Sequence, residues 1–220
     1  MIEIKNLNKI YLKGKKNMVH ALNNINLKID DRETVAIIGE SGAGKSTLLH
    51  IMSCIDNFDG EYYLDNIDIN KLSESKKSKL RSSKIGIVLQ DFALIDDFTV
   101  FENVMTPLYF NKKIKDKKGS VMRALKKTGI VSLKAKKVSQ LSGGQKQRVA
   151  ISRALVTSPE YIFADEPTGS LDSKTSEEIV KMLFDLNRNG ITIVIVTHNL
   201  EIANQCHHIC LLYTSDAADE

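Results

Sequence analysis

The chain has 220 residues, of which 42% are hydrophobic and 26% charged, a composition that excludes disordered and fibrous proteins and fits one domain or one domain with a sizeable insertion. Lys and Arg number 31 against 27 Asp and Glu, and this net charge of +4 gives no reason to expect a nucleic-acid partner. No apolar run approaches the roughly 20 residues of a membrane span, and the N-terminus lacks a signal-peptide pattern. With three cysteines in no framework spacing, we expect a cytoplasmic protein.

Short segments rich in Ile and Val alternate along the chain with segments of helical period. Several are apolar on both faces, which is typical of buried, largely parallel strands that helices cover on both sides. The clearest helix, residues 177–187, ends at Asn189-Gly190. The fold is therefore expected to be α/β, with strands at residues 2–4, 25–29, 34–38, 85–89, 161–164 and 191–196.

A phosphate-loop pattern, G-x-x-x-x-G-K-[ST], lies between the strand at 34–38 and a helical segment. Its glycines allow turn conformations in which successive N–H groups point at phosphate oxygens, and the following helix adds its positive end. Lys45 is expected to bridge the β- and γ-phosphates, and the Ser46 hydroxyl to ligate Mg²⁺. The expected nucleotide-binding residues of this loop are Gly39, Glu40, Ser41, Gly42, Ala43, Gly44, Lys45, Ser46 and Thr47.

Residues from about 91 to 158 contain no strand signal, and we expect them to form a helical subdomain inserted into the α/β core. Thr99 and Glu102 predict a capping box, and helical segments follow Ser120 and Gly144. Lysines cluster at 71–84, 112–118 and 126–137. Such clusters are typical of solvated helix faces, or they lie near anionic lipid headgroups or the acidic loops of a partner.

Asp165 and Glu166 follow the apolar strand at 161–164. An Asp at the carboxyl end of a buried strand can hold Mg²⁺ through its water shell, while the adjacent Glu orients an attacking water. A lone Asp-Glu pair can instead begin a helix. Because Pro167 and Gly169 follow and a phosphate loop is present, we favour the metal and base roles.

The segment Leu141-Ser142-Gly143-Gly144-Gln145 and residues 146–155 resemble the signature motif and helix of ATP-binding cassette (ABC) ATPases. A serine and two glycines at a helix N-terminus make an anion-binding end, here without a lysine of its own. The resemblance implies a head-to-tail dimer, in which the signature of one protomer closes on the γ-phosphate held by the other. The residues expected to act in trans are Ser142, Gly143, Gly144 and Gln145.

Other positions of this family can be assigned from the same resemblance. It implies that Gln90 contacts Mg²⁺ and links the core to the helical subdomain, and that Asp172, in Gly169-Ser170-Leu171-Asp172, communicates across the dimer. His198 resembles the histidine that contacts the γ-phosphate and fixes the water, although a lone strand-end histidine is often structural. Tyr11 lies where the family stacks an aromatic ring on adenine, but it can equally be a packing residue.

Residues 46–50, 101–108 and 165–172 resemble the lipoprotein-releasing and macrolide-exporter group, which includes a cell-division member. Val138 and residues 53–56 depart from that pattern. The resemblance covers residues 1–209 and implies an ATPase that uses ATP and Mg²⁺, with catalytic Lys45, Glu166 and His198. It also implies a subunit that associates with the cytoplasmic face of a bacterial membrane and powers a separate integral membrane permease, exporting or releasing a peptide, lipid-linked or drug-like substrate.

Three alternatives remain beside that hypothesis. A cell-division member would signal across the membrane rather than transport. A soluble ABC ATPase acting on DNA or ribosomes would need coiled-coil insertions or tandem cassettes, which 220 residues do not hold. A non-catalytic nucleotide sensor fits poorly, because Lys45, Asp165, Glu166 and His198 occur together.

Residues 210–220 do not continue the family pattern. Their codons can be written as a transposase adapter used in library preparation, so we expect a non-native tail that replaces the natural C-terminus. The segment Cys206-His207-His208-x-Cys210 has irregular spacing, and strand alternation would split its side chains between two faces. We therefore expect no zinc site there.

Overall fold

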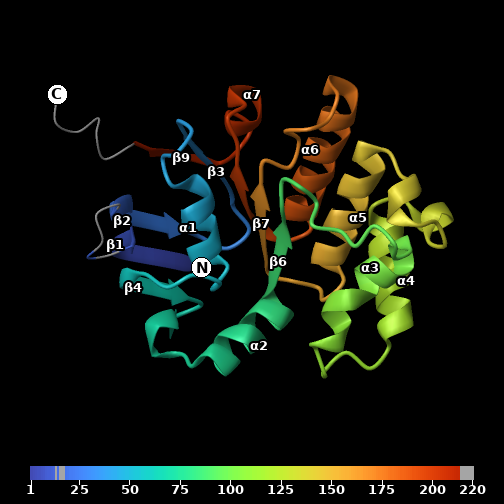
Figure 1. The fold of residues 1–220 in the computed structure, drawn as a ribbon, viewed down its shortest axis with the longest axis horizontal. Coiled ribbons are helices and arrows are strands. Elements are labelled where there is room, and N and C mark those ends of the chain that lie inside the picture. The colour runs from blue at the N-terminus through green and yellow to red at the C-terminus, as the bar shows by residue number, and fades with distance from the viewer. Residues whose placement is uncertain (13, 15–17, 214–220) are drawn as a thin grey trace.

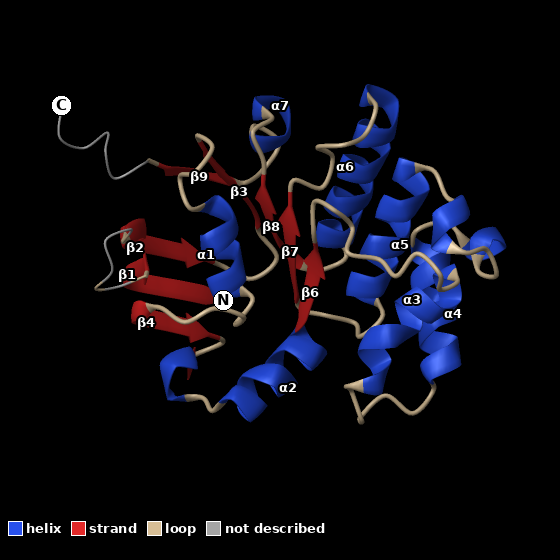
Figure 2. Ribbon diagram, in the orientation of Figure 1, coloured by secondary structure: helices blue, strands red, loops and turns tan. Residues whose placement is uncertain are grey.

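The computed structural model describes residues 1–12, 14 and 18–213. The strands form two sheets, and the helices pack against them (Figures 1 and 2). The strands are β1 Ile2–Tyr11, β2 Val19–Ile29, β3 Thr34–Gly39, β4 Asp59–Leu64, β5 Ile67–Asp68, β6 Ile85–Val88, β7 Tyr161–Asp165, β8 Thr192–Val196 and β9 His208–Leu212. The α-helices are α1 Lys45–Met52, α2 Glu74–Lys84, α3 Val100–Met105, α4 Lys117–Lys127, α5 Gly143–Leu155, α6 Ser173–Arg188 and α7 Leu200–Ala203. The 3₁₀-helices are η1 Ile69–Lys71, η2 Thr106–Tyr109, η3 Val131–Leu133 and η4 Val138–Gln140.

The central sheet is parallel, with the strand order β6-β7-β8-β3-β9. Its inner strands are buried on both faces, and alternate residues enter different cores: Tyr161 and Phe163 of β7 face one core, and Ile162 and Ala164 face the other. This arrangement confirms the predicted α/β class. It also explains why these strands appear in the sequence as continuous apolar runs.

A second sheet, with the order β2-β1-β4-β5, is antiparallel. The expected strands 2–4 and 25–29 belong to it, so their assignment to a largely parallel sheet was wrong. Ile2 pairs with Ile29 and Ile4 with Leu27, and only Ile2, Ile4 and Leu7 of β1 are buried, as in a sheet with one solvated face. Helix α1 lies between the two sheets (Figure 1), and its apolar side chains fill the core that they share.

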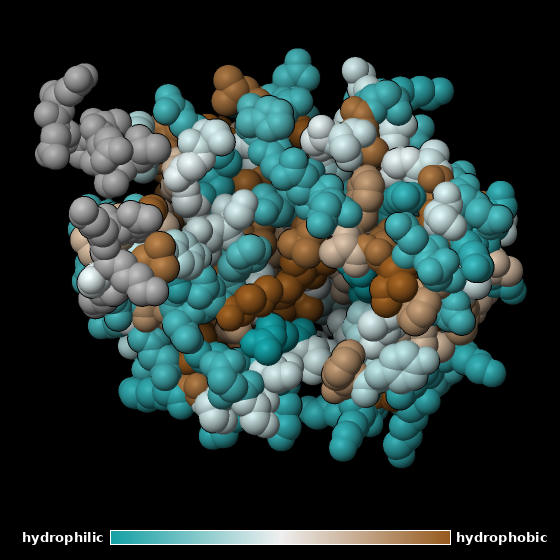
Figure 3. Space-filling view, viewed as in Figure 1, coloured by the Kyte–Doolittle hydropathy of each residue, from teal (hydrophilic) through white to brown (hydrophobic). Residues whose placement is uncertain are grey.

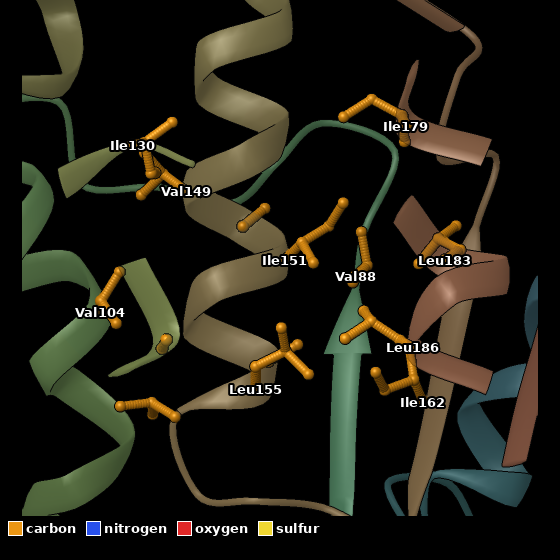
Figure 4. Packing of buried hydrophobic residues seen from close by; sticks show 14 of the residues in the cluster. Val88, Val104, Ile130, Val149, Ile151, Leu155, Ile162, Ile179, Leu183 and Leu186 are labelled. Carbon is orange, nitrogen blue, oxygen red and sulfur yellow. The ribbon is translucent and has the colours of Figure 1, made fainter. Parts of the chain in front are cut away.

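The predicted helical region covers the other face of the parallel sheet. Figure 4 shows Ile151 and Leu155 of α5 between the β6 residue Val88 and the helices beyond. The capping box is confirmed, because Thr99 Oγ1 accepts from Glu102 N at 3.2 Å and the Glu102 carboxylate accepts from Thr99 N at 2.7 Å. One continuous core joins this region to the sheet, so the helices are held rigidly beside the strands that end at the candidate site.

Helices α4 and α6 begin earlier than the sequence pattern predicts. Asp116 caps α4, and Asp172 caps α6, which begins at Ser173, four residues before the expected start at 177. Polar first turns conceal these starts from a search for apolar periodicity. In the described part of the chain, no helix has the length and apolarity needed to cross a membrane.

Strand β9 pairs with β3 at the edge of the parallel sheet, with Ile37 opposite Cys210 and Gly39 opposite Leu212. It therefore includes the first three residues of the predicted non-native tail. Pairing along a sheet edge uses backbone groups, so it does not depend on the origin of those residues. The non-native origin stays a prediction, and residues 214–220 lie outside the described residues.

Candidate functional site

The phosphate loop connects β3 to α1 through a backbone that requires glycine. Gly42 and Gly44 have φ values of +87° and +86°, in the left-handed region. A Cβ atom on Gly44 would lie 2.2 Å from the carbonyl oxygen of Ala21 in β2. The antiparallel sheet therefore packs directly against the loop and fixes where α1 begins.

Lys45 reaches back across the loop that precedes it. Its Nζ donates to the carbonyl oxygens of Gly39 and Glu40, both at 2.8 Å. The ammonium group thus lies on the concave side of the loop, where a point charge can meet phosphate oxygens. Glu40 contributes only its backbone there, and Ala43 is buried in the core.

An open groove of about 590 Å³ runs from this loop over the carboxyl ends of the parallel strands. It brings together residues from the β1 end, the phosphate loop, the β6 and β7 ends and the β8 end. Most predicted site residues line it, whereas Glu40 and Ala43 do not. The lining residues are Tyr11, Val19, Ala21, Gly39, Ser41, Gly42, Gly44, Lys45, Ser46, Thr47, Gln90, Asp165, Glu166, Val196 and His198.

Glu166 and His198 form a pair across two neighbouring strand ends. His198 Nδ1 lies 2.9 Å from Glu166 Oε1, and Glu166 N donates to Val196 O at 2.9 Å. Glu166 has a φ of +43°, a left-handed conformation that is rare outside glycine and that clusters at functional sites. Glu166 lines the same groove as Asp165, with its carboxylate held by His198.

The oxygen donors around the loop fit Mg²⁺. Ser46, Gln90 and Asp165 line the same groove, and Asp165 is 8% exposed at the end of β7. Hydroxyl, amide and carboxylate oxygens are the hard donors that this ion prefers, with phosphate oxygens and water completing its octahedron. Their assignment as ligands stays a prediction that the donor set supports.

Tyr11 is held at the rim of the groove. Its hydroxyl donates to Asp56 Oδ2 at 2.7 Å, and Lys9 Nζ lies 4.8 Å from the ring centroid. Burial raises the pKa of the Tyr11 hydroxyl, and the bond to Asp56 raises it further. The ring is therefore neutral and fixed beside the groove, and its stacking on adenine stays a prediction.

The signature residues lie apart from this groove. Ser142 and Gln145 cap the N-terminus of α5 reciprocally, and none of the four signature residues is among the groove-lining residues. A Cβ atom on Gly144 would lie 2.4 Å from Thr175 Cγ2, and Asp172 accepts hydrogen bonds from Thr175 that lower the Asp172 pKa. Asp172 thus fixes the residue against which the signature packs.

The sequence gives no direct signal for the role of Arg153, which lies on α5 after the signature. Its guanidinium donates to the carbonyl oxygens of Phe92, at 2.7 Å, and Ala93. Both residues have positive φ values, +62° and +45°, and they lie just after Gln90. Arg153 therefore connects the signature helix to the loop that begins at Gln90.

The two histidines of the Cys206–Cys210 segment contact Thr34 and Glu33. His207 Nδ1 lies 2.7 Å from Thr34 Oγ1, and His208 Nε2 lies 3.1 Å from Glu33 Oε1. The described residues include no cluster of three or more His, Cys, Asp or Glu that could hold a metal ion.

Comparison with known proteins identifies the family of this chain. The sequence profile described as "ABC transporter" matches residues 22–169. The chain belongs to the ABC transporter family. The predicted membership of the ABC ATPases is thus confirmed, and the chain is an ABC transporter ATP-binding subunit.

Two relatives show how the cassette occurs elsewhere. The ABC transporter ATP-binding protein MJ0796 of Methanocaldococcus jannaschii is 43% identical over 227 residues, which cover 100% of this chain and 96% of that protein. The macrolide export ATP-binding/permease protein MacB of Mannheimia succiniciproducens is 41% identical over 222 residues, which cover 100% of this chain and 34% of that protein. In MacB, the matching cassette is therefore about a third of a longer protein.

A solved structure shares the fold. The dimeric post-hydrolysis state of MJ0796, bound to ADP and Pi, has a TM-score of 0.88 and 41% identity, and the match covers 98% of this chain and 97% of that one. The predicted P-loop NTPase architecture is thereby confirmed.

Proposed function

We propose that this ABC ATPase powers a separate integral membrane permease that exports or releases a peptide, lipid-linked or drug-like substrate at the cytoplasmic face of a membrane. The observation that carries the ATPase part is the convergence of the phosphate loop, Asp165 and the Glu166–His198 pair on one groove. The similarity to MacB, whose name describes macrolide export, supports the export part.

The residues of the groove divide the reaction between them. Lys45 holds the β- and γ-phosphates, and Ser46, Gln90 and Asp165 are positioned to hold Mg²⁺, which when bound neutralises phosphate charge. Glu166 orients a water for in-line attack on the γ-phosphorus. A P–O bond to that water oxygen forms and the bond to ADP breaks, so that ATP and water become ADP and phosphate.

His198 supports Glu166 in this step. The 2.9 Å contact between its Nδ1 and Glu166 Oε1 fixes the carboxylate and leaves its second oxygen for the water. Catalysis then rests mainly on position and charge, as phosphoryl transfer requires.

A second groove suits the permease. It has a volume of about 270 Å³ and lies where α2, β6 and the helical region meet, and apolar residues that include Ile55, Ile87, Leu89 and Pro107 line it. Figure 3 shows an apolar hollow at the centre of this face. Because Leu89 lines it next to Gln90, a permease segment seated there would contact the element that senses Mg²⁺.

The substitution Glu166→Gln tests the catalytic assignment. It keeps the size of the side chain but removes the carboxylate charge, so we expect ATP binding to persist and turnover to fall about 10²- to 10⁴-fold. Phosphate release measures turnover, and equilibrium titration with ATP measures binding. Near-normal turnover would place the base on another residue.

A further inference from the structure

Positive charge is concentrated in two segments outside the nucleotide site. They are α2 (Glu74–Lys84) and residues 109–118, which lead from η2 into α4. Together they contain ten Lys and Arg residues and two acidic ones, a net charge of +8, whereas the whole chain has +4. The rest of the molecule is therefore net negative.

The two segments form one surface, which we call the basic face. The buried Asn111 donates from Nδ2 to the carbonyl oxygen of Ser82 at 2.9 Å, and its Oδ1 accepts from Lys113 N at 3.1 Å. These bonds pin residues 109–118 to the second half of α2. Figure 1 shows α2 and the segment before α4 along the lower edge of the molecule.

Aromatic rings lie exposed among these charges. Tyr109 is 65% exposed and Phe110 is 75% exposed, and Lys117 Nζ lies 5.2 Å from the Tyr109 ring centroid. The same two segments carry exposed lysines for which the described part of the chain shows no ion pair: Lys76, Lys79, Lys112, Lys113, Lys115 and Lys118. Two adjacent exposed rings within a concentration of lysines combine the two features that membrane-interface surfaces share.

We propose that the basic face binds the anionic surface of a lipid bilayer, with Phe110 and Tyr109 inserted among the headgroups. Lysines attract anionic headgroups, and aromatic rings are favoured at the membrane interface. An acidic protein loop would satisfy the lysines but leave no reason for the exposed rings.

The basic face also borders the apolar groove, since Arg81 and Ser82 of α2 line that groove. That a permease in the groove would hold this edge near the bilayer rests on the proposed function. The charge and the exposure of the basic face are observations that do not depend on the proposed function.

Sedimentation of the full chain with lipid vesicles tests the proposal. We expect binding to vesicles that contain phosphatidylglycerol, little binding to pure phosphatidylcholine, and release by high salt. Replacing Lys112, Lys113, Lys115 and Lys118 together by Gln should weaken binding at least 100-fold, at roughly fivefold for each lysine. The variant Phe110→Ser should weaken it roughly tenfold and leave the salt dependence unchanged.

A matched control removes the same charge elsewhere in the helical region, by replacing the exposed Lys126, Lys127, Lys134 and Lys136 with Gln. It should change vesicle binding by less than about threefold, because those lysines lie outside the basic face. An equal loss in the control, equal binding to neutral vesicles, or no binding by the unaltered chain would overturn the proposal. The ATPase activity of the unaltered chain is measured in parallel without vesicles. Absence of that activity would count against the proposed function and not against the membrane contact.

Discussion

At the scale of single residues, two consecutive acidic residues of the groove differ in backbone conformation. Asp165 ends β7 with a strand conformation, while Glu166 has a φ of +43°, which costs a non-glycine residue about 1–2 kcal/mol. Hydrogen bonds from Glu166 N to Val196 O and from Gly169 N to Glu166 O hold that turn. The strained backbone thus holds Glu166 in the groove next to Asp165, within contact of His198.

The phosphate loop offers a matched pair of glycine substitutions. Gly42 and Gly44 have nearly the same φ, but a Cβ atom meets nothing within 4 Å at Gly42 and a backbone oxygen at 2.2 Å at Gly44. We expect Gly42→Ala to lower the free energy of unfolding by about 1 kcal/mol, the cost of the conformation alone. Gly44→Ala should lower it by at least about 3 kcal/mol, since β2 or the loop must shift.

Urea denaturation without nucleotide measures both variants. An equal loss of unfolding free energy in the two variants would show that Ala21 moves aside without an energetic cost. The contact between the antiparallel sheet and the loop would then have no structural role.

At the scale of elements, α5 carries a contact between the signature and the loop after Gln90. The substitution Arg153→Met removes two hydrogen bonds to carbonyl oxygens of residues held at positive φ. We expect amide hydrogen exchange at residues 91–94 to accelerate at least about tenfold, and stability to fall by about 2–3 kcal/mol. Arg153→Lys keeps the charge but not the fork of donors, so its effect should be intermediate. Unchanged exchange in Arg153→Met would contradict this link.

A polar network connects the two sheets at the amino end of β7, away from the nucleotide groove. Burial alone would raise the pKa of Asp65, at the turn after β4, but hydrogen bonds from Lys84 and Tyr161 lower it from 3.8 to about 2. The amino group of Met1, 3.0 Å from Asp65 Oδ1, contributes to the same shift. Asp65 is thus charged in the folded chain over a wider pH range than in the unfolded chain.

This shift predicts the acid sensitivity of the fold. The pKa of Asp65 is lower in the folded chain than in the unfolded chain, so charged Asp65 stabilises the fold by about 2 kcal/mol. This stabilisation is complete above about pH 4 and is lost as the pH falls toward 2. Thermal unfolding at several pH values should show the decline in the unaltered chain and a shallower decline in Asp65→Asn. Parallel curves would contradict the assignment.

Burial decides which elements the sequence could predict. Strands β3, β6, β7 and β8 are buried on both faces, and the sequence predicts each of them. Strand β4 begins with three exposed residues and β5 has only two residues, so neither shows an apolar pattern. The role of Arg153 depends on backbone carbonyls 60 and 61 positions away, which no local pattern reveals.

The site residues follow the same division. The phosphate loop, Asp165 and Glu166 are contiguous motifs whose chemistry can be derived from spacing. Predicting Gln90, His198 and the signature needed the family resemblance, because each is predicted to act on a ligand that other segments hold. Two strands of the antiparallel sheet were predicted as strands, but their pairing was not, because the apolar pattern of a strand does not identify its partner.

At the scale of the whole molecule, one chain holds two incomplete parts of a nucleotide site. The phosphate loop and its carboxylates line one groove, and the signature at the α5 N-terminus lies outside it. The related MJ0796 cassette forms a dimer with ADP and Pi. A head-to-tail dimer would bring the signature of each copy to the γ-phosphate held by the other.

The central claim is that ATP joins two copies through these parts. The most direct measurement is the mass in solution of Glu166→Gln with and without ATP, by light scattering after size exclusion. We predict a monomer without ATP and a dimer with it. The same chain carrying Ser142→Arg should bind ATP and stay monomeric, because the arginine blocks the α5 N-terminus from the partner's phosphate. A Glu166→Gln chain that binds ATP and remains a monomer, or a Ser142→Arg chain that dimerises equally well, would contradict the account.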